Sequence, residues 1–229
     1  MKPLERLGEA HAPDGTILAL TRRDDEYMIL AGGKPLMTSR MHGSEEALAT
    51  FGCRYLPKRA PRVLVGGLGM GFTVRAALDL MPPDGTVVVS ELVPEVLEWN
   101  RGPLGPLANH PLDDPRVRVE IGDVRQALRA ARAAFDAILL DVDNSPDAFT
   151  LAANEWLYTD GGLAVTRDAL RPGGAYAVWS TREDKAFTAR LKRAGFDVTV
   201  ERVRARLQHG GSRHMIFVAH LPAKAGSRA

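Results

Sequence analysis

The chain has 229 residues, of which 45% are hydrophobic and 25% are charged, so it is long enough to bury a core as one main domain with a small appendage. The 30 basic and 28 acidic residues leave a formal charge of +2, which argues against a nucleic-acid or membrane partner and for a small-molecule substrate. The single cysteine, Cys53, excludes an internal disulfide and a cysteine-rich zinc site. No apolar run approaches the ~20 residues that span a bilayer, and we expect a cytoplasmic protein.

The first 43 residues are predicted to form a small β region. Apolar stretches at 16–20 and 27–31 are separated by the charged run 22–26, a pattern typical of antiparallel strands. Ser44 is predicted to be the N-cap of a helix that ends near Phe51, because Glu45 and Glu46 follow it and favour the positive end of a helix. We therefore expect a β region at 1–43, a main domain at 44–222 and a flexible tail at 223–229.

From Arg62 onward, short apolar runs alternate with helical segments, which is typical of βαβ units. Strands are expected at 63–65, 87–90, 117–121, 137–140, 175–179, 196–203 and 215–219, and helices near 72–80, 94–100, 124–131, 161–170 and 184–193. The polar, glycine-bearing stretch 208–213 suits a hairpin between the last two strands. The predicted fold class is α/β, with a Rossmann-like, seven-stranded, mostly parallel sheet whose last strand is antiparallel, preceded by a small N-terminal β-hairpin region.

A glycine-rich turn joins the first strand of this sheet to its helix and carries Gly66, Gly67, Gly69 and Gly71. Glycine lacks the Cβ that would keep a ligand away from the backbone, although the same turn could simply be tight. Glu91 ends the next strand, about 20 residues further on, where a carboxylate can accept hydrogen bonds from ribose hydroxyls.

Two further strands also end in carboxylates. Asp123, followed by Val124, is a candidate for binding an adenine amino group and equally for capping the helix 124–131. Asp141 ends the fourth strand and could take a proton from an acceptor or hydrogen-bond the loop or the cofactor. Since the carboxyl ends of parallel strands meet at one edge, Glu91, Asp123 and Asp141 are expected to converge on the glycine loop. This arrangement favours an adenosyl site over a nicotinamide site.

These motifs resemble the spermidine synthase family, the polyamine aminopropyltransferases, within the class I S-adenosylmethionine-dependent methyltransferase fold. The segments 114–117, 157–159 and 170–174 add to the resemblance, which covers nearly the whole chain. It implies an enzyme of polyamine biosynthesis, dimeric in the manner of the family, that moves an aminopropyl group from decarboxylated S-adenosylmethionine to a small amine without a metal. It also implies that Glu91 contacts the ribose, that Asp123 lies near the adenine and that Asp141 lies beside the reacting centre.

Two positions depart from the family pattern. Gly69 stands where the family commonly has an aspartate that holds the donor amino group. Asn144 stands where the family usually has a second aspartate, for which Asp143 or Asp147 could substitute. The acceptor candidates are thus Asp143 and Asn144, together with His42 and Tyr158. A solvated loop is the alternative for His42, and core packing is the alternative for Tyr158.

Two other functions stay open at this level. Gly69 resembles the simpler loops of methyltransferases, so intact S-adenosylmethionine could donate a methyl group to a small molecule. The chain could also be an adenosyl-binding protein without catalysis. The expected cofactor is therefore S-adenosylmethionine or its decarboxylated form.

Overall fold

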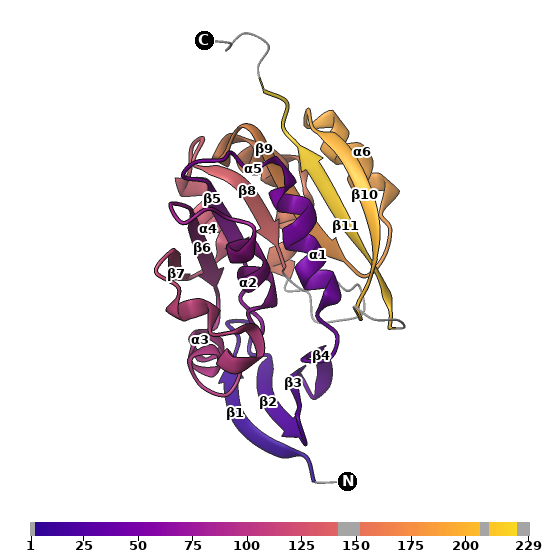
Figure 1. Ribbon diagram of the computed structural model, residues 1–229. Coiled ribbons are helices and arrows are strands. Elements are labelled where there is room, and N and C mark those ends of the chain that lie inside the picture. The colour runs from indigo at the N-terminus through magenta and orange to yellow at the C-terminus, as the bar shows by residue number, and fades with distance from the viewer. Residues whose placement is uncertain (1–2, 142–151, 207–210, 224–229) are drawn as a thin grey trace.

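The computed structural model describes residues 3–141, 152–206 and 211–223, which form two sheets flanked by helices (Figure 1). The larger sheet has seven strands in the order β10-β11-β9-β8-β5-β6-β7. Strand β11 pairs antiparallel with both of its neighbours, and the remaining pairs are parallel. The predicted fold class is confirmed. The strands are β5 (Arg62–Gly66), β6 (Thr86–Glu91), β7 (Val117–Ile121), β8 (Phe135–Leu140), β9 (Leu170–Ser180), β10 (Asp197–Arg204) and β11 (Arg213–His220).

Helices cover both faces of this sheet because its central strands are apolar on both sides. In β5, Val63 and Val65 join the core under one set of helices, whereas Leu64 joins the core under the other set. The first set is α1 (Gly43–Gly52), α2 (Phe72–Asp79) and α3 (Pro94–Arg101). The second set is α4 (Val124–Ala130), α5 (Asp160–Ala169) and α6 (Lys185–Arg193). Short 3-10 helices lie at η1 (Cys53–Tyr55), η2 (Gly105–Ala108), η3 (Pro111–Asp113) and η4 (Ala152–Tyr158).

The N-terminal region is a four-stranded antiparallel sheet in the order β1-β2-β3-β4. Its strands are β1 (Glu5–His11), β2 (Ile17–Arg23), β3 (Glu26–Ala31) and β4 (Lys34–Thr38). The sequence predicted β2 and β3 but not the two edge strands. In β1, Gly8 lies against the indole of Trp99, and a Cβ at Gly8 would be 2.5 Å from the indole nitrogen. Packing on α3 therefore stabilises a segment whose own strand pattern is weak.

The predicted N-cap of the first helix is wrong. The N-cap of α1 is His42, not Ser44, and it makes no side-chain cap hydrogen bond. Ser44 lies inside the helix, where its hydroxyl donates to the Glu45 carboxylate (2.7 Å). The bounds predicted for the five later helices agree with the structure to within one residue.

Cys53 is buried, as its interpretation as a small apolar residue predicted. Burial raises the pKa of its thiol to about 12, so the thiol stays protonated and unreactive at neutral pH. In the described ranges, no helix has the length and apolar character needed to cross a membrane.

Candidate active site

The loop after β5 requires glycine at several positions. Gly67, Gly69 and Gly71 have φ angles of 91°, 53° and 85°, in the left-handed region that glycine adopts without strain. A Cβ at Gly66 would lie 2.8 Å from the Leu140 side chain and 3.0 Å from the Val124 side chain. The loop therefore connects β5 to α2 and exposes backbone without side chains at Gly67, Gly69 and Gly71.

Glu91 holds this loop in place from the end of β6. The buried carboxylate accepts hydrogen bonds from the backbone N–H groups of Leu68 (2.8 Å) and Val93 (2.9 Å). Burial raises the pKa of Glu91, and these hydrogen bonds offset part of the rise. The sequence predicted a ribose ligand at this residue, and the structure adds a role that the sequence did not reveal, since one side chain fixes the loop and the start of α3 together.

Asp123 caps helix α4, as one of its two sequence interpretations predicted. Its carboxylate accepts a hydrogen bond from the Arg125 backbone N–H (2.8 Å) and forms an ion pair with the Arg125 guanidinium. Burial alone would raise the pKa of Asp123, but the hydrogen bonds and charge of Arg125 outweigh burial and lower it. Asp123 is therefore ionised at neutral pH and already has a cationic partner.

Asp141 follows β8, and Glu45 approaches it from the first turn of α1. The Asp141 backbone N–H donates to the Gly66 carbonyl (3.0 Å), and the Thr73 hydroxyl donates to Asp141 Oδ2 (2.6 Å). Burial and then the negative charge of Asp141 raise the pKa of Glu45 to about 8. Glu45 therefore keeps its proton at neutral pH. The sequence predicted Glu45 only as an acid at a helix end, because nothing local indicates that α1 packs beside the end of β8.

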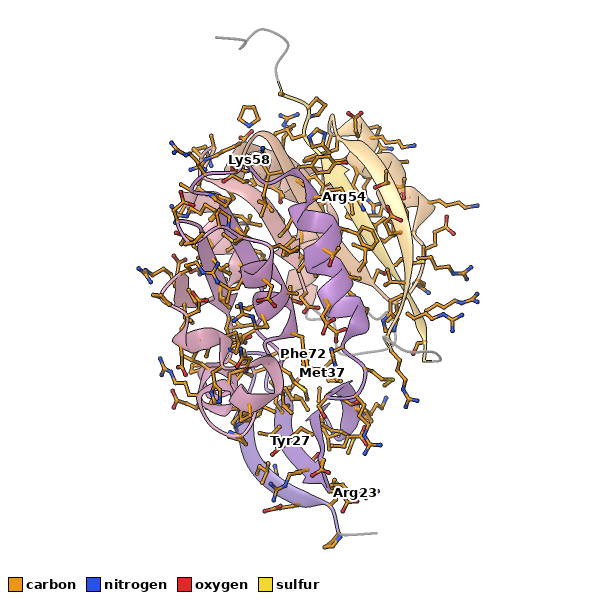
Figure 2. The ribbon with its side chains drawn as sticks, in the orientation of Figure 1. Arg23, Tyr27, Met37, Arg54, Lys58 and Phe72 are labelled. Atoms are coloured by element: carbon orange, nitrogen blue, oxygen red, sulfur yellow. The ribbon has the colours of Figure 1, made fainter. Side chains whose placement is uncertain are left out.

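These residues surround a cavity of about 480 Å³, within the range of small-molecule sites. The N-terminal sheet supplies an apolar wall that includes Ile29 and Met37, opposite the glycine loop. Figure 2 shows Met37 and Phe72 at the junction between the two sheets. The lining residues are Ala12, Pro13, Asp14, Thr16, Leu18, Ile29, Ala31, Leu36, Met37, Glu45, Gly67, Gly69, Ser90, Glu91, Leu92, Val93, Val96, Gly122, Asp123, Val124, Arg125, Asp141 and Trp179.

Two of the four predicted acceptor residues, His42 and Tyr158, do not line this cavity. His42 stacks on Phe72, with ring centroids 4.1 Å apart, and its Nδ1 lies 2.7 Å from a Glu46 carboxylate oxygen. Tyr158 packs edge-on against Phe187, with centroids 5.3 Å apart. Neither side chain is among the lining residues. Asp143 and Asn144 lie outside the described residues. Within the described part of the chain, no group of three or more potential ligands could hold a metal ion.

Comparisons with known proteins identify relatives of the chain in sequence and in structure. No family model matches the chain. The polyamine aminopropyltransferase of Mycobacterium tuberculosis is 32% identical over 198 residues, which cover 82% of this chain and 36% of that protein. The chain is related to the spermidine synthase family. The resemblance inferred from the sequence is thereby confirmed, although the chain spans less than half the length of the curated relatives that it matches.

Solved spermidine synthases share the architecture. The enzyme from Thermotoga maritima superposes with a TM-score of 0.73 at 18% identity, covering 94% of this chain and 72% of that one. A spermidine synthase in complex with the transition-state analogue AdoDATO gives a TM-score of 0.71 at 19% identity, with the same coverage. At these identities the structural likeness establishes the fold alone.

Proposed function

We propose that the chain transfers an aminopropyl group from decarboxylated S-adenosylmethionine to a small amine acceptor. The observation that carries the proposal is the excess of acidic over basic side chains among the described residues that line the cavity. Glu45 and Asp141 lie beside the glycine loop, and Arg125, which pairs with Asp123, is the single cation among the described lining residues. Ammonium groups on both substrates complement such a cavity, whereas the carboxylate of an intact S-adenosylmethionine would face negative charge.

The described residues fit an adenosyl sulfonium. The backbone at Gly67 and Gly69 lies open to the cavity, as a close-binding nucleoside requires. Glu91 would hold the ribose hydroxyls, as the family resemblance implies. Asp123 and Val124 would bind the adenine. The cavity volume also suits a nucleoside of this size.

The chemistry asked of the protein is modest. A bound sulfonium supplies a carbon whose bond to sulfur breaks with the electron pair remaining on sulfur, as the amine nitrogen forms its bond to that carbon. The chain has to align the two substrates, which provides much of the rate, and to accept one proton from the amine. Asp141 is our candidate for the proton acceptor, because it lines the cavity and the Thr73 hydroxyl fixes its carboxylate.

Methyl transfer is the second candidate function, and one observation favours it. Gly69 has no side chain to hold a donor ammonium, and a Cβ there would lie 2.9 Å from the Met37 methyl carbon. The loop therefore has no negative side chain at this position to repel the carboxylate of intact S-adenosylmethionine, and in this it resembles the simpler loops of methyltransferases.

Donor preference separates the two functions. Under the aminopropyl proposal, decarboxylated S-adenosylmethionine raises the melting temperature more than S-adenosylmethionine does, since at equal concentration the ligand of higher affinity stabilises the folded state more. Mass spectrometry of an amine panel then shows products heavier by one aminopropyl group. Methylated products would support the second candidate, and donor binding with no turnover on the panel would contradict both.

We also propose a cytoplasmic homodimer with a domain boundary near residue 43, supported by the family resemblance and by the sequence pattern. Light scattering after size exclusion should then give twice the chain mass of 24.9 kDa. A mass of 24.9 kDa at micromolar concentration would contradict the dimer. The predicted tail lies outside the described residues from 224 onward.

A further inference from the structure

Glu45 and Asp141 border a small recess beside the main cavity as well as the main cavity itself. They are the only acids among the described residues that line this recess, and the others are Met37, Thr38, Leu68, Met70 and Phe72. The Thr73 hydroxyl joins the two elements, since it donates to Asp141 Oδ2 (2.6 Å) and lies 3.4 Å from the Glu45 carbonyl oxygen. The structure thus holds two carboxylates at one end of a largely apolar cavity.

Among the residues that the structure describes, the groups that face Glu45 do not neutralise a negative charge there. Asp141 and Glu46 add negative charge, and the Ser44 hydroxyl donates a neutral hydrogen bond to Glu45 Oε2 (2.7 Å). On β11, the Nδ1 of His214 lies 3.0 Å from the Ser44 hydroxyl. Burial lowers the pKa of His214, so at neutral pH its imidazole is uncharged. Before a substrate binds, Glu45 is uncharged because it is protonated and not because a cation pairs with it.

We propose that Glu45 and Asp141 form an ammonium site in which a substrate ammonium group replaces the proton of Glu45. This inference rests on the proposed function and deepens it, because it assigns to α1 the charged partner that the loop lacks at Gly69. Two carboxylates hold one cation better than one, since each contributes Coulomb attraction in a poorly hydrated cavity. Binding is then an exchange, in which the ammonium enters and one proton leaves to solvent.

The exchange has a measurable signature. At pH 7, a carboxyl group with a pKa of about 8 is about 90% protonated. Binding an ammonium-bearing ligand at pH 7 should therefore release about 0.9 proton, whereas a ligand without an ammonium group should release none from this site. Affinity for the cationic ligand should rise close to tenfold per pH unit between pH 6 and pH 7.5.

Isothermal titration calorimetry in two buffers of different ionisation enthalpy measures the released protons. Methylthioadenosine carries the adenosyl group without an ammonium, and decarboxylated S-adenosylmethionine carries both. We expect decarboxylated S-adenosylmethionine to release about 0.9 proton more than methylthioadenosine at pH 7. A third titration adds 1,4-diaminobutane to the methylthioadenosine complex, and proton release in that titration instead would assign the site to the acceptor.

Two variants complete the test. Glu45→Gln keeps the size of the side chain and its ability to accept from Ser44, and it should abolish the proton release and weaken binding of the ammonium ligand about tenfold or more, with methylthioadenosine binding changed less than about twofold. Glu46→Gln makes the same charge change one residue along the same helix, outside the cavity, and should keep the proton release.

The outcomes separate this inference from the function beneath it. Methylthioadenosine that binds, with no extra proton released by either ammonium ligand on the unmodified protein, overturns the ammonium site and leaves the adenosyl site standing. Proton release that persists in Glu45→Gln also overturns it. Failure of methylthioadenosine to bind at all overturns the proposed function, and the ammonium site with it. The unmodified protein alone decides the first comparison, even if a variant folds poorly.

Discussion

Glu45 should make the stability of the protein depend on pH in a way that Glu45→Gln removes. The folded-state pKa of Glu45 is about 8 against an ordinary value of 4.5, so the folded protein holds this proton more tightly than the unfolded chain does. The resulting stabilisation is fully present below pH 4.5 and is lost as the pH rises through 8. Each pKa unit corresponds to about 1.4 kcal/mol, which sets an upper limit of about 5 kcal/mol for the loss.

Glutamine resembles the protonated acid and does not titrate, so the variant should escape this loss. The free energy of unfolding of Glu45→Gln minus that of the unmodified protein should grow by about 2 to 4 kcal/mol between pH 5 and pH 8.5. The raised pKa of Glu91 and the lowered pKa of His214 also affect stability, but they act in both proteins and cancel in the difference.

Urea unfolding followed by circular dichroism at half-unit steps from pH 5 to pH 9, without ligand, measures this difference. Glu46→Gln, in the same helical turn, serves as the control and should give a nearly constant difference. A Glu45→Gln difference that stays constant within about 0.5 kcal/mol across the range would refute the buried, protonated Glu45 on which the ammonium site depends.

Three further predictions test the rest of the site. Asp141→Asn should lower kcat by a factor of about 10² to 10⁴ while methylthioadenosine still binds within a few-fold, as measured by steady-state kinetics and calorimetry, and unchanged turnover would remove Asp141 from proton transfer. Gly71→Ala should lower the free energy of unfolding, measured in urea, by about 1 to 3 kcal/mol, because φ is 85° and the new Cβ would lie 3.0 Å from Asn100 Oδ1. An unchanged urea midpoint would show that the loop relaxes freely. Glu91→Gln places an N–H donor where a carboxylate oxygen now accepts from a backbone N–H, so it should lower the free energy of unfolding by about 1 to 3 kcal/mol. It should also weaken methylthioadenosine binding at least tenfold, and full affinity would contradict the ribose role.

The features that the sequence predicted are those that short segments encode. An apolar run that ends in glycines or in a carboxylate specifies a buried strand and the residue at its end, which is how Glu91 and Asp141 could be placed without a structure. The N-cap at Asp123 is equally local, since the carboxylate bonds to a backbone N–H only two residues away. Ser44 shows the limit of such signals. A typical capping residue instead lies inside α1, where tertiary packing places it between Glu45 and His214.

The sequence by itself determined the succession of strands and helices along the main domain, the glycine loop and the acids at the strand ends, because hydrophobic periodicity and turn chemistry act over a few residues. Only the tertiary structure decided that Glu45 lies near Asp141 and that Met37 of the N-terminal sheet lies against Gly69 at the cavity. These contacts join segments far apart along the chain, and their formation depends on how α1 and the small sheet pack against the large one. The charge of the cavity, on which the proposed chemistry depends, is therefore a property of the packed fold.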